Sequence, residues 1–273
     1  MSKTEYYYPK GGLPKRGKIL IGQAVFKEAY AVIPREVMTD IVTSYFPNWE
    51  KTRAWVLAKP MSGFSTTFSQ YIMNVSPNGG SDRPEEDMGI ESVIFVLSGK
   101  MNLEIQGDKT ELNSGYYCYI PPNTHWTISN DSKEDGYFHW IRKRYEIVDG
   151  IGFPEFFVKN ERDIEAIAMH KDDNSWTTTR FVDPADLRHD MHVNIVNFKP
   201  GGLIPFLETH VMEHGIYILQ GRGTYRLNED WVEVQAGDFL WLRAFCPQAC
   251  YTDGPEDFRY LLYKDVNRQM VLP

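Results

Sequence analysis

Apolar and aromatic residues along this chain fall into short runs that are separated by turn-forming residues. The second half has four such runs, rich in Tyr, Trp, Val, Ile and Leu, at 216–219, 224–227, 231–234 and 239–242. The first half repeats the pattern at 93–97, 101–105, 109–112 and 116–120. The segments between the runs contain Gly, Asn, Asp and Ser, which are typical turn residues. Short strands at such close spacing predict an antiparallel sandwich or barrel.

The two halves of the chain match each other at a constant offset of 122 residues (201 − 79, 221 − 99 and 237 − 115). The offset is carried by three glycine pairs, which are Gly79 with Gly201, Gly99 with Gly221 and Gly115 with Gly237. Because these pairs lie inside matching strand patterns, they indicate a duplicated domain. We therefore predict an all-β chain with one barrel in residues 1–150 and a second in residues 151–273. The second range begins with a linker over about 150–189, in which residues 160–170 are predicted to form a short helix.

Each repeat contains a Pro followed by Gly-Gly, then a strand and a glycine-containing turn, and later Gly-Tyr or Gly-Asp at the start of another strand. This order resembles the two sequence motifs of the cupin family, whose fold is a jelly-roll barrel. The resemblance implies a bicupin with two tandem barrels and a few short helices. The second repeat carries the closer match.

Composition and charge narrow the class of protein. Hydrophobic residues make up 42% of the chain and charged residues 24%, which is typical of a globular protein. The 29 basic and 37 acidic residues give a net charge of −8, which argues against a nucleic-acid partner or an anionic membrane surface. No apolar run approaches the roughly 20 residues that span a bilayer, and the first residues lack the apolar stretch of a signal peptide. We therefore expect a cytoplasmic protein.

The segment 208–214, Glu-Thr-His-Val-Met-Glu-His, carries the most informative side chains. Side chains at i and i+2 of a strand share a face, so Glu208 and His210 can converge, and His214 can join them after a bend. In cupins a fourth donor lies in the hairpin after the second motif's glycine, where this chain has Gln248. Two imidazole nitrogens and two oxygens suit Mn²⁺, Fe²⁺, Ni²⁺ or Zn²⁺, and the oxygen share favours Mn²⁺. The alternative is that Glu208 and His214 are surface residues of an acidic loop.

The first repeat does not carry the same donors. At the offset of 122, the four candidate ligands correspond to Glu86, Met88, Ser92 and Trp126. We therefore predict one metal ion per chain, in the C-terminal barrel, and a metal-free N-terminal barrel that serves as a scaffold.

The last strand, at 258–264, alternates between two faces, with Phe258, Tyr260, Leu262 and Lys264 on one of them. If this face lines the barrel, Lys264 brings an ammonium group to the site. Because an unpaired buried charge is costly, an inward lysine implies an anionic partner such as a substrate carboxylate. The alternative is a lysine that reaches water from the strand end. Tyr225 is likewise either part of the aromatic wall or a hydroxyl donor.

A longer run is more specific than the cupin motifs. It reads Glu-Thr-His-x-x-Glu-His-Gly-x-Tyr-Ile-Leu-x-Gly-x-Gly-x-Tyr at 208–225, followed by Gly-Asp at 237–238 and Tyr-Lys-Asp-x-Asn-Arg at 263–268. With similar features in the first half, the chain resembles the (S)-ureidoglycine aminohydrolase family, bicupin enzymes of purine degradation. The resemblance implies Mn²⁺ bound by Glu208, His210, His214 and Gln248. It implies substrate contacts from Glu208, Tyr225, Gln248, Tyr260 and Lys264.

The activity implied by this resemblance is metal-dependent hydrolysis of a small ureide, (S)-ureidoglycine, to (S)-ureidoglycolate and ammonia in allantoin degradation. Glu208 and Lys264 are then the expected catalytic residues, Glu208 for proton transfer and Lys264 for pairing with the carboxylate. The alternatives are a cupin dioxygenase or decarboxylase acting on a small acid, and a non-catalytic bicupin that binds a small ligand. A homo-oligomer is expected, because cupins commonly associate through barrel edges.

Overall fold

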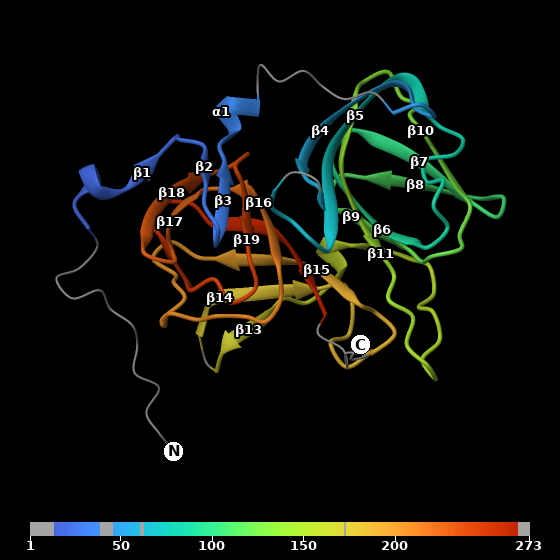
Figure 1. Ribbon diagram of the computed structural model, residues 1–273. Coiled ribbons are helices and arrows are strands. Elements are labelled where there is room, and N and C mark those ends of the chain that lie inside the picture. Colours follow the sequence, from blue (N-terminus) through green and yellow to red (C-terminus); the bar gives the residue numbers. More distant parts are fainter. Residues whose placement is uncertain (1–13, 39–45, 61–62, 172, 267–273) are drawn as a thin grey trace. The chain divides into compact units, whose positions relative to one another are not determined.

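The structure, a computed structural model, describes residues 14–38, 46–60, 63–171 and 173–266 (Figure 1). These residues divide into two compact units. The C-terminal barrel comprises the described residues of 14–38, 166–180 and 192–266, and the N-terminal barrel comprises those of 46–165 and 181–191. Both units consist almost entirely of strands, so the predicted all-β class is confirmed. Short helices occur only at α1 (Arg35–Met38) and at the 3₁₀ turns Arg16–Lys18 and Glu161–Asp163 among the described helical elements.

The C-terminal barrel has two sheets, with strand orders β13-β14-β15-β21-β16-β19-β3-β2 and β1-β18-β17-β20. Its core contains Phe198, Ile218, Tyr225 and Phe258, all fully or almost fully buried. Its strands are β1 (Leu20–Ile21), β2 (Val25–Phe26), β3 (Tyr30–Ile33), β13 (Ile167–His170), β14 (Asp173–Arg180), β15 (Met191–Phe198), β16 (His214–Gln220), β17 (Arg222–Leu227), β18 (Asp230–Gln235), β19 (Phe239–Leu242), β20 (Gln248–Thr252) and β21 (Phe258–Asp265).

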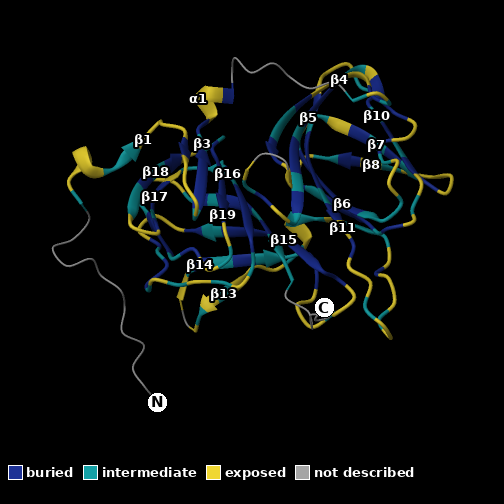
Figure 2. Cartoon of the chain, in the orientation of Figure 1, coloured by how far each residue is buried: buried dark blue, intermediate teal, exposed yellow. Residues whose placement is uncertain are grey.

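The N-terminal barrel is one sheet with the order β12-β9-β6-β11-β5-β10-β7-β8, and β4 pairs with β5. Its core is strongly aromatic, and Figure 2 shows buried residues along the strands of both barrels. Its strands are β4 (Glu50–Ala58), β5 (Phe68–Ser81), β6 (Ile90–Ser98), β7 (Lys100–Ile105), β8 (Asp108–Asn113), β9 (Tyr116–Ile120), β10 (Trp126–Ser129), β11 (Gly136–Arg144) and β12 (Phe157–Asn160).

The predicted duplication is visible in the turns. Gly99 and Gly221 have φ angles of 75° and 76°, in the left-handed region that favours glycine. A Cβ atom at either position would lie 2.5 Å from a backbone oxygen, that of Asp135 and of Asp257 respectively, and these two residues also differ by 122. The pair Gly79 and Gly201 matches less closely, because Gly201 has a φ of 78° whereas in the first barrel the positive φ of 57° falls one residue earlier, on Asn78.

The predicted boundary at residue 150 is wrong, because segments on each side of it belong to the other barrel. β3 pairs with β19, and the Tyr30 hydroxyl donates to Asp230 at 2.8 Å, so the first described strands complete the C-terminal barrel. Residues 181–191 belong to the N-terminal barrel instead. There Phe181 stacks on Tyr117 with ring centroids 4.1 Å apart, and Asp190 accepts a hydrogen bond from Lys143 at 2.6 Å.

The predicted helix at 160–170 is also wrong. Only Glu161–Asp163 forms a single 3₁₀ turn, and β12 and β13 occupy the flanking residues. The eight strands predicted from the apolar runs all form. Across the described residues, no helix is long and apolar enough to cross a membrane.

Candidate metal centre and substrate cavity

A cavity of about 120 Å³ lies in the C-terminal barrel. At about 30 Å³ per water molecule, this volume corresponds to roughly four waters, so it suits a small ligand. Its apolar lining includes Trp176, Val196, Ile204, Ile216, Tyr260 and Leu262. Its polar lining consists of Thr178, Arg180, Asn194, Glu208, His210, His214, Gln248 and Lys264.

Strand alternation explains which side chains reach this cavity. β21 contributes Tyr260, Leu262 and Lys264, which share one face because they are spaced two residues apart. Of the two possibilities that the sequence left open for the last strand, the structure shows the one in which this face lines the cavity. On the neighbouring strand β16, His214 lies directly opposite Lys264 in the antiparallel register. This pairing brings an imidazole and an ammonium group to the same part of the cavity.

The four predicted metal ligands lie together at the cavity. Glu208 Oε1 is 3.2 Å from His210 Nε2 and 3.5 Å from Gln248 Nε2. Two backbone hydrogen bonds between Glu208 and Gln248, at 3.0 and 2.9 Å, hold the loop that carries Glu208 against the start of β20. The His210 and His214 ring centroids are 5.0 Å apart. Two imidazoles, a carboxylate and an amide are thus gathered from three separate segments.

These residues fit a divalent metal ion in two respects. His214 is only 4% exposed, and its Nε2 is buried without a hydrogen-bond partner, as a nitrogen intended for a ligand would be. Burial, and then electrostatic repulsion from the neighbouring His210 and Lys264, lower the pKa of His214 to about 3, so the ring is neutral, which is the form that binds metals. Within the described residues, no group of three or more His, Cys, Asp or Glu side chains lies in an arrangement that could hold a metal ion as it stands, and Glu208 and His210 contact each other directly.

Lys264 and Arg180 bring positive charge to the cavity. Burial, and then the positive charge of Arg180, lower the pKa of Lys264, while Glu208 opposes this shift. Within the described chain, neither cation has a carboxylate within 4.0 Å. Their charges are therefore available to a bound anion.

The two predicted substrate-binding tyrosines occupy different positions. Tyr260 lines the cavity. Tyr225 is fully buried in the core, with its ring centroid 6.4 Å from that of Tyr260, and it is not part of the lining. Burial raises the pKa of Tyr225 well above its usual range, so its hydroxyl keeps its proton. The structure thus places Tyr225 behind the cavity wall.

The sequence prediction missed three polar residues of the lining, which are Thr178, Arg180 and Asn194. Thr178 and Arg180 lie two residues apart on β14, on the face that also carries Trp176. The period of two at 176–180 was a usable signal. The sequence prediction does not use it, because it places residues 150–189 in a linker and expects no barrel strand there.

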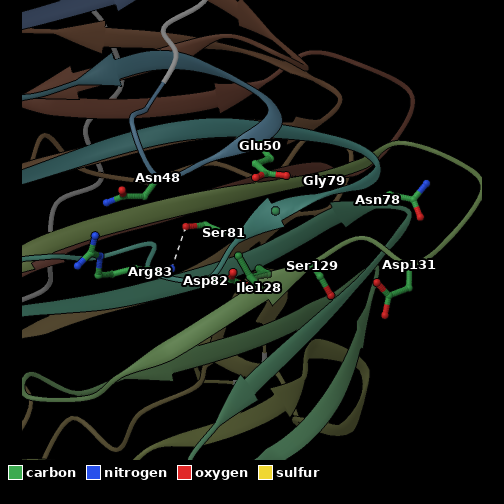
Figure 3. Close-up of a pocket in the computed structure, with 11 residues that line it drawn as sticks. Asn48, Glu50, Asn78, Gly79, Ser81, Asp82, Arg83, Ile128, Ser129 and Asp131 are labelled. Atoms are coloured by element: carbon green, nitrogen blue, oxygen red, sulfur yellow. Dashed lines mark hydrogen bonds between the residues drawn. The ribbon is translucent and has the colours of Figure 1, made fainter.

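A larger pocket, of about 570 Å³, lies on the N-terminal barrel (Figure 3). It is lined by backbone at Gly79 and Gly80 and by polar side chains that include Glu50, Asp82 and Arg83. The lining contains no histidine or cysteine, so it lacks the imidazole donors found in the other barrel. Size alone therefore does not identify the candidate metal centre.

Comparison with known proteins adds family information to this geometry. The family model for the cupin domain matches residues 71–142 and 194–263, which fall in the N-terminal and the C-terminal barrel respectively. A protein of Escherichia coli (strain K12) named (S)-ureidoglycine aminohydrolase is 32% identical over 257 residues, covering 93% of this chain and 95% of that protein. An Arabidopsis thaliana protein of the same name is 31% identical, covering 90% of this chain and 78% of that protein.

A solved structure is similar over the whole chain. It is the crystal structure of a Pseudomonas aeruginosa protein described as glyoxylate-induced, with 58% sequence identity and a TM-score of 0.87. The alignment covers 99% of each chain. The likeness therefore extends to both barrels.

Proposed function

Because the chain belongs to the cupin family, as a bicupin related over most of its length to enzymes named (S)-ureidoglycine aminohydrolase, we propose that it hydrolyses (S)-ureidoglycine to (S)-ureidoglycolate and ammonia. The observation that carries this proposal is the small cavity in which His214 faces Lys264 and the other metal-ligand candidates lie alongside. Such a site combines a position for a metal ion with a position for a carboxylate, which suits a small α-amino acid substrate.

Glu208, His210, His214 and Gln248 would hold the metal ion, and we propose Mn²⁺ because two of the four donors are oxygens. When bound, this ion supplies a Lewis acid and an anchor for one face of the substrate's α-carbon. The orphaned Nε2 of His214 and the neutral state of its ring support the assignment. We propose one ion per chain, with the N-terminal barrel as a metal-free scaffold.

The reaction replaces a carbon–nitrogen bond by a carbon–oxygen bond at the α-carbon. The amino group leaves as ammonia with a proton, and water supplies the hydroxyl group and releases a proton. Glu208 is the carboxylate in the cavity lining, so it is placed to move a proton between these groups. Lys264 would hold the carboxylate of the substrate, and Tyr260 would donate to its carboxylate or ureido oxygen. Tyr225 would support Tyr260 from behind.

The proposal is tested by following ammonia from freshly prepared (S)-ureidoglycine with Mn²⁺-loaded protein and with EDTA-treated protein. We expect release above the spontaneous rate, lost with EDTA and restored by Mn²⁺. Absence of acceleration by protein with a measured metal content of one ion per chain would contradict the proposal. It would favour a dioxygenase, a decarboxylase or a ligand-binding bicupin.

We further propose that the reaction belongs to purine and allantoin degradation in the cytoplasm, and that the protein is a homo-oligomer. The family relationship supports the pathway assignment. Measurement of the molar mass in solution by light scattering tests the oligomer.

A further inference from the structure

The charged side chains that line the cavity are unbalanced. They comprise two cations, Arg180 and Lys264, and one carboxylate, Glu208. Glu208 already contacts His210 at 3.2 Å and is a candidate metal ligand, so it is not free to neutralise either cation. Keeping two unpaired cations partly buried in one small cavity is unfavourable unless a ligand neutralises them.

Arg180 reaches this cavity from a different part of the sheet than Lys264. It ends β14, and it shares a face with Trp176 and Thr178, which also line the cavity. β15 lies between β14 and β21 in the sheet order, so the two cations come from strands on either side of β15. Asn194 of β15 lies opposite Arg180 in the register and lines the cavity as well.

Among the described residues, no side-chain hydrogen bond or ion pair is made by the Arg180 guanidinium group, although its backbone pairs with Asn194 in the sheet. This distinguishes it from Arg142, Arg188, Arg222 and Arg243, each of which pairs with a carboxylate. A guanidinium group has a planar fork of donors that matches a carboxylate in a bidentate manner, whereas an ammonium group acts as a point charge. An unpaired arginine beside an unpaired lysine in a small cavity is therefore suited to one carboxylate.

We propose that Arg180 is a specificity-determining residue that binds the substrate carboxylate together with Lys264. Arg180 supplies the bidentate contact that selects an acid over a neutral amide of the same shape. This inference rests on the proposed function for the identity of the substrate, and on the cavity geometry alone for the chemical class of the ligand, a small monocarboxylic acid.

The test compares two ligands that differ only at the carboxylate. N-carbamoylglycine lacks the α-amino group of the substrate and so has nothing to lose as ammonia, and N-carbamoylglycinamide replaces its carboxylate by a neutral amide. Binding of both to Mn²⁺-loaded protein is measured by calorimetry for the wild type and for Arg180→Gln, Arg180→Lys and Arg222→Gln. Arg222 is the matched control, because it is exposed, pairs with Asp253 and does not line the cavity.

We expect the wild type to prefer the acid, and Arg180→Gln to lose about 10- to 100-fold of acid affinity while its affinity for the amide changes little. Arg180→Lys should recover part of the loss, since it keeps the charge without the fork. Arg222→Gln should match the wild type. With (S)-ureidoglycine, Arg180→Gln should raise KM by a similar factor and change kcat by less than about threefold.

An acid-to-amide preference that is unchanged in folded Arg180→Gln would overturn the inference, and so would an equal loss of both ligands. A circular dichroism spectrum and melting temperature close to the wild type identify the variant as folded. If the wild type releases no ammonia but binds the acid through Arg180, the proposed function fails and this inference stands. If the wild type releases ammonia but Arg180→Gln keeps the preference for the acid, the proposed function stands and this inference fails.

Discussion

The two barrels share a strand framework but differ in whether the cation at a matching position has a carboxylate partner. In the C-terminal barrel His214 lies opposite Lys264, and in the N-terminal barrel Ser92 lies opposite Arg142, at the same offset of 122 (214 − 92 and 264 − 142). Lys264 lines the cavity, and among the described residues no carboxylate forms an ion pair with it. Arg142 instead bonds Glu85 at 2.5 Å and lies 4.7 Å from the ring centroid of Trp140.

An aromatic side chain takes the place of one polar donor, Gln248, in the N-terminal barrel. Gln248 has Trp126 as its counterpart, since Gln248 pairs with Leu227 and Trp126 with Ile105 (248 − 126 and 227 − 105). Trp126 and Trp49 pack on Trp140 with ring centroids 6.0 and 5.4 Å away. The comparison supports the proposal that the shared strand framework does not by itself supply metal ligands, which depend instead on polar side chains at a few inward positions of the C-terminal barrel.

The largest expected effect comes from removing an imidazole. His214→Ala should abolish stoichiometric metal binding and reduce ammonia release to the spontaneous rate. Removing a residue that only hydrogen-bonds to a metal ligand lowers metal affinity or activity by about 10- to 100-fold, and removing a ligand itself should have a larger effect. Metal content per chain and initial rates measure this. Ser92→Ala, at the matching position, should change neither. Full metal content in His214→Ala would break the proposed asymmetry between the barrels.

A smaller but still large effect is expected from Glu208→Gln. The amide keeps an oxygen for the metal but cannot carry the proton, so kcat should fall by about 100- to 10,000-fold while metal remains bound. The counterpart at the offset of 122 is the exposed Glu86, which interacts with Arg83 at 3.7 Å, and Glu86→Gln should have no effect. Full turnover by metal-loaded Glu208→Gln would exclude the proton-transfer role.

The two cations at matching positions, Lys264 and Arg142, should have different roles. Lys264 should affect substrate binding, and Arg142 should affect stability. Lys264→Met should raise KM by about 10- to 100-fold without lowering the melting temperature, because it breaks no ion pair. Arg142→Met should leave KM unchanged but lower the free energy of unfolding by about 2 kcal/mol. A fully buried pair would cost about 3–5 kcal/mol, and the Arg142 side chain is 23% exposed while that of Glu85 is 7% exposed. Kinetics and urea denaturation of both variants measure the contrast. If both variants changed KM and the free energy of unfolding in the same way, this contrast between the barrels would be wrong.

The barrels also share a buried glutamate that an aromatic side chain holds by a hydrogen bond. The Tyr119 hydroxyl donates to Glu91 at 2.7 Å, and Trp241 Nε1 donates to Glu213 at 2.6 Å, with both residues offset by 122 (241 − 119 and 213 − 91). Burial, and then the hydrogen bond to and negative charge of Asp190, raise the pKa of Glu91 well above its usual range. In the folded protein Glu91 therefore keeps its proton at pH values where the unfolded chain has lost it.

The smallest expected effect follows from this shift. Since the folded state binds one more proton, stability falls as pH rises above the ordinary glutamate pKa of 4.5. Glu91→Gln should remove this loss, so its melting temperature should exceed that of the wild type at pH 8 and approach it at pH 4. Glu104→Gln, at a half-buried residue that pairs with Lys109 at 3.5 Å, should show no such pH-dependent difference. Equal melting temperatures of Glu91→Gln and wild type at pH 8 would contradict the prediction.

The sequence by itself determined the eight predicted strands and which residues of the last strand share a face, because these depend on a local period of two, and it showed the duplication through the constant glycine offset. The spacing of Glu208, His210 and His214 likewise marked the metal-ligand candidates before any strand was placed. Tertiary structure decided the rest. Tyr30 bonds Asp230 across 200 residues, so the first strands complete the last barrel, and a local pattern does not specify a partner that distant. Only the assembled sheet brought Arg180 to the cavity and placed Tyr225 behind its wall, because exposure to a cavity depends on all the strands around it.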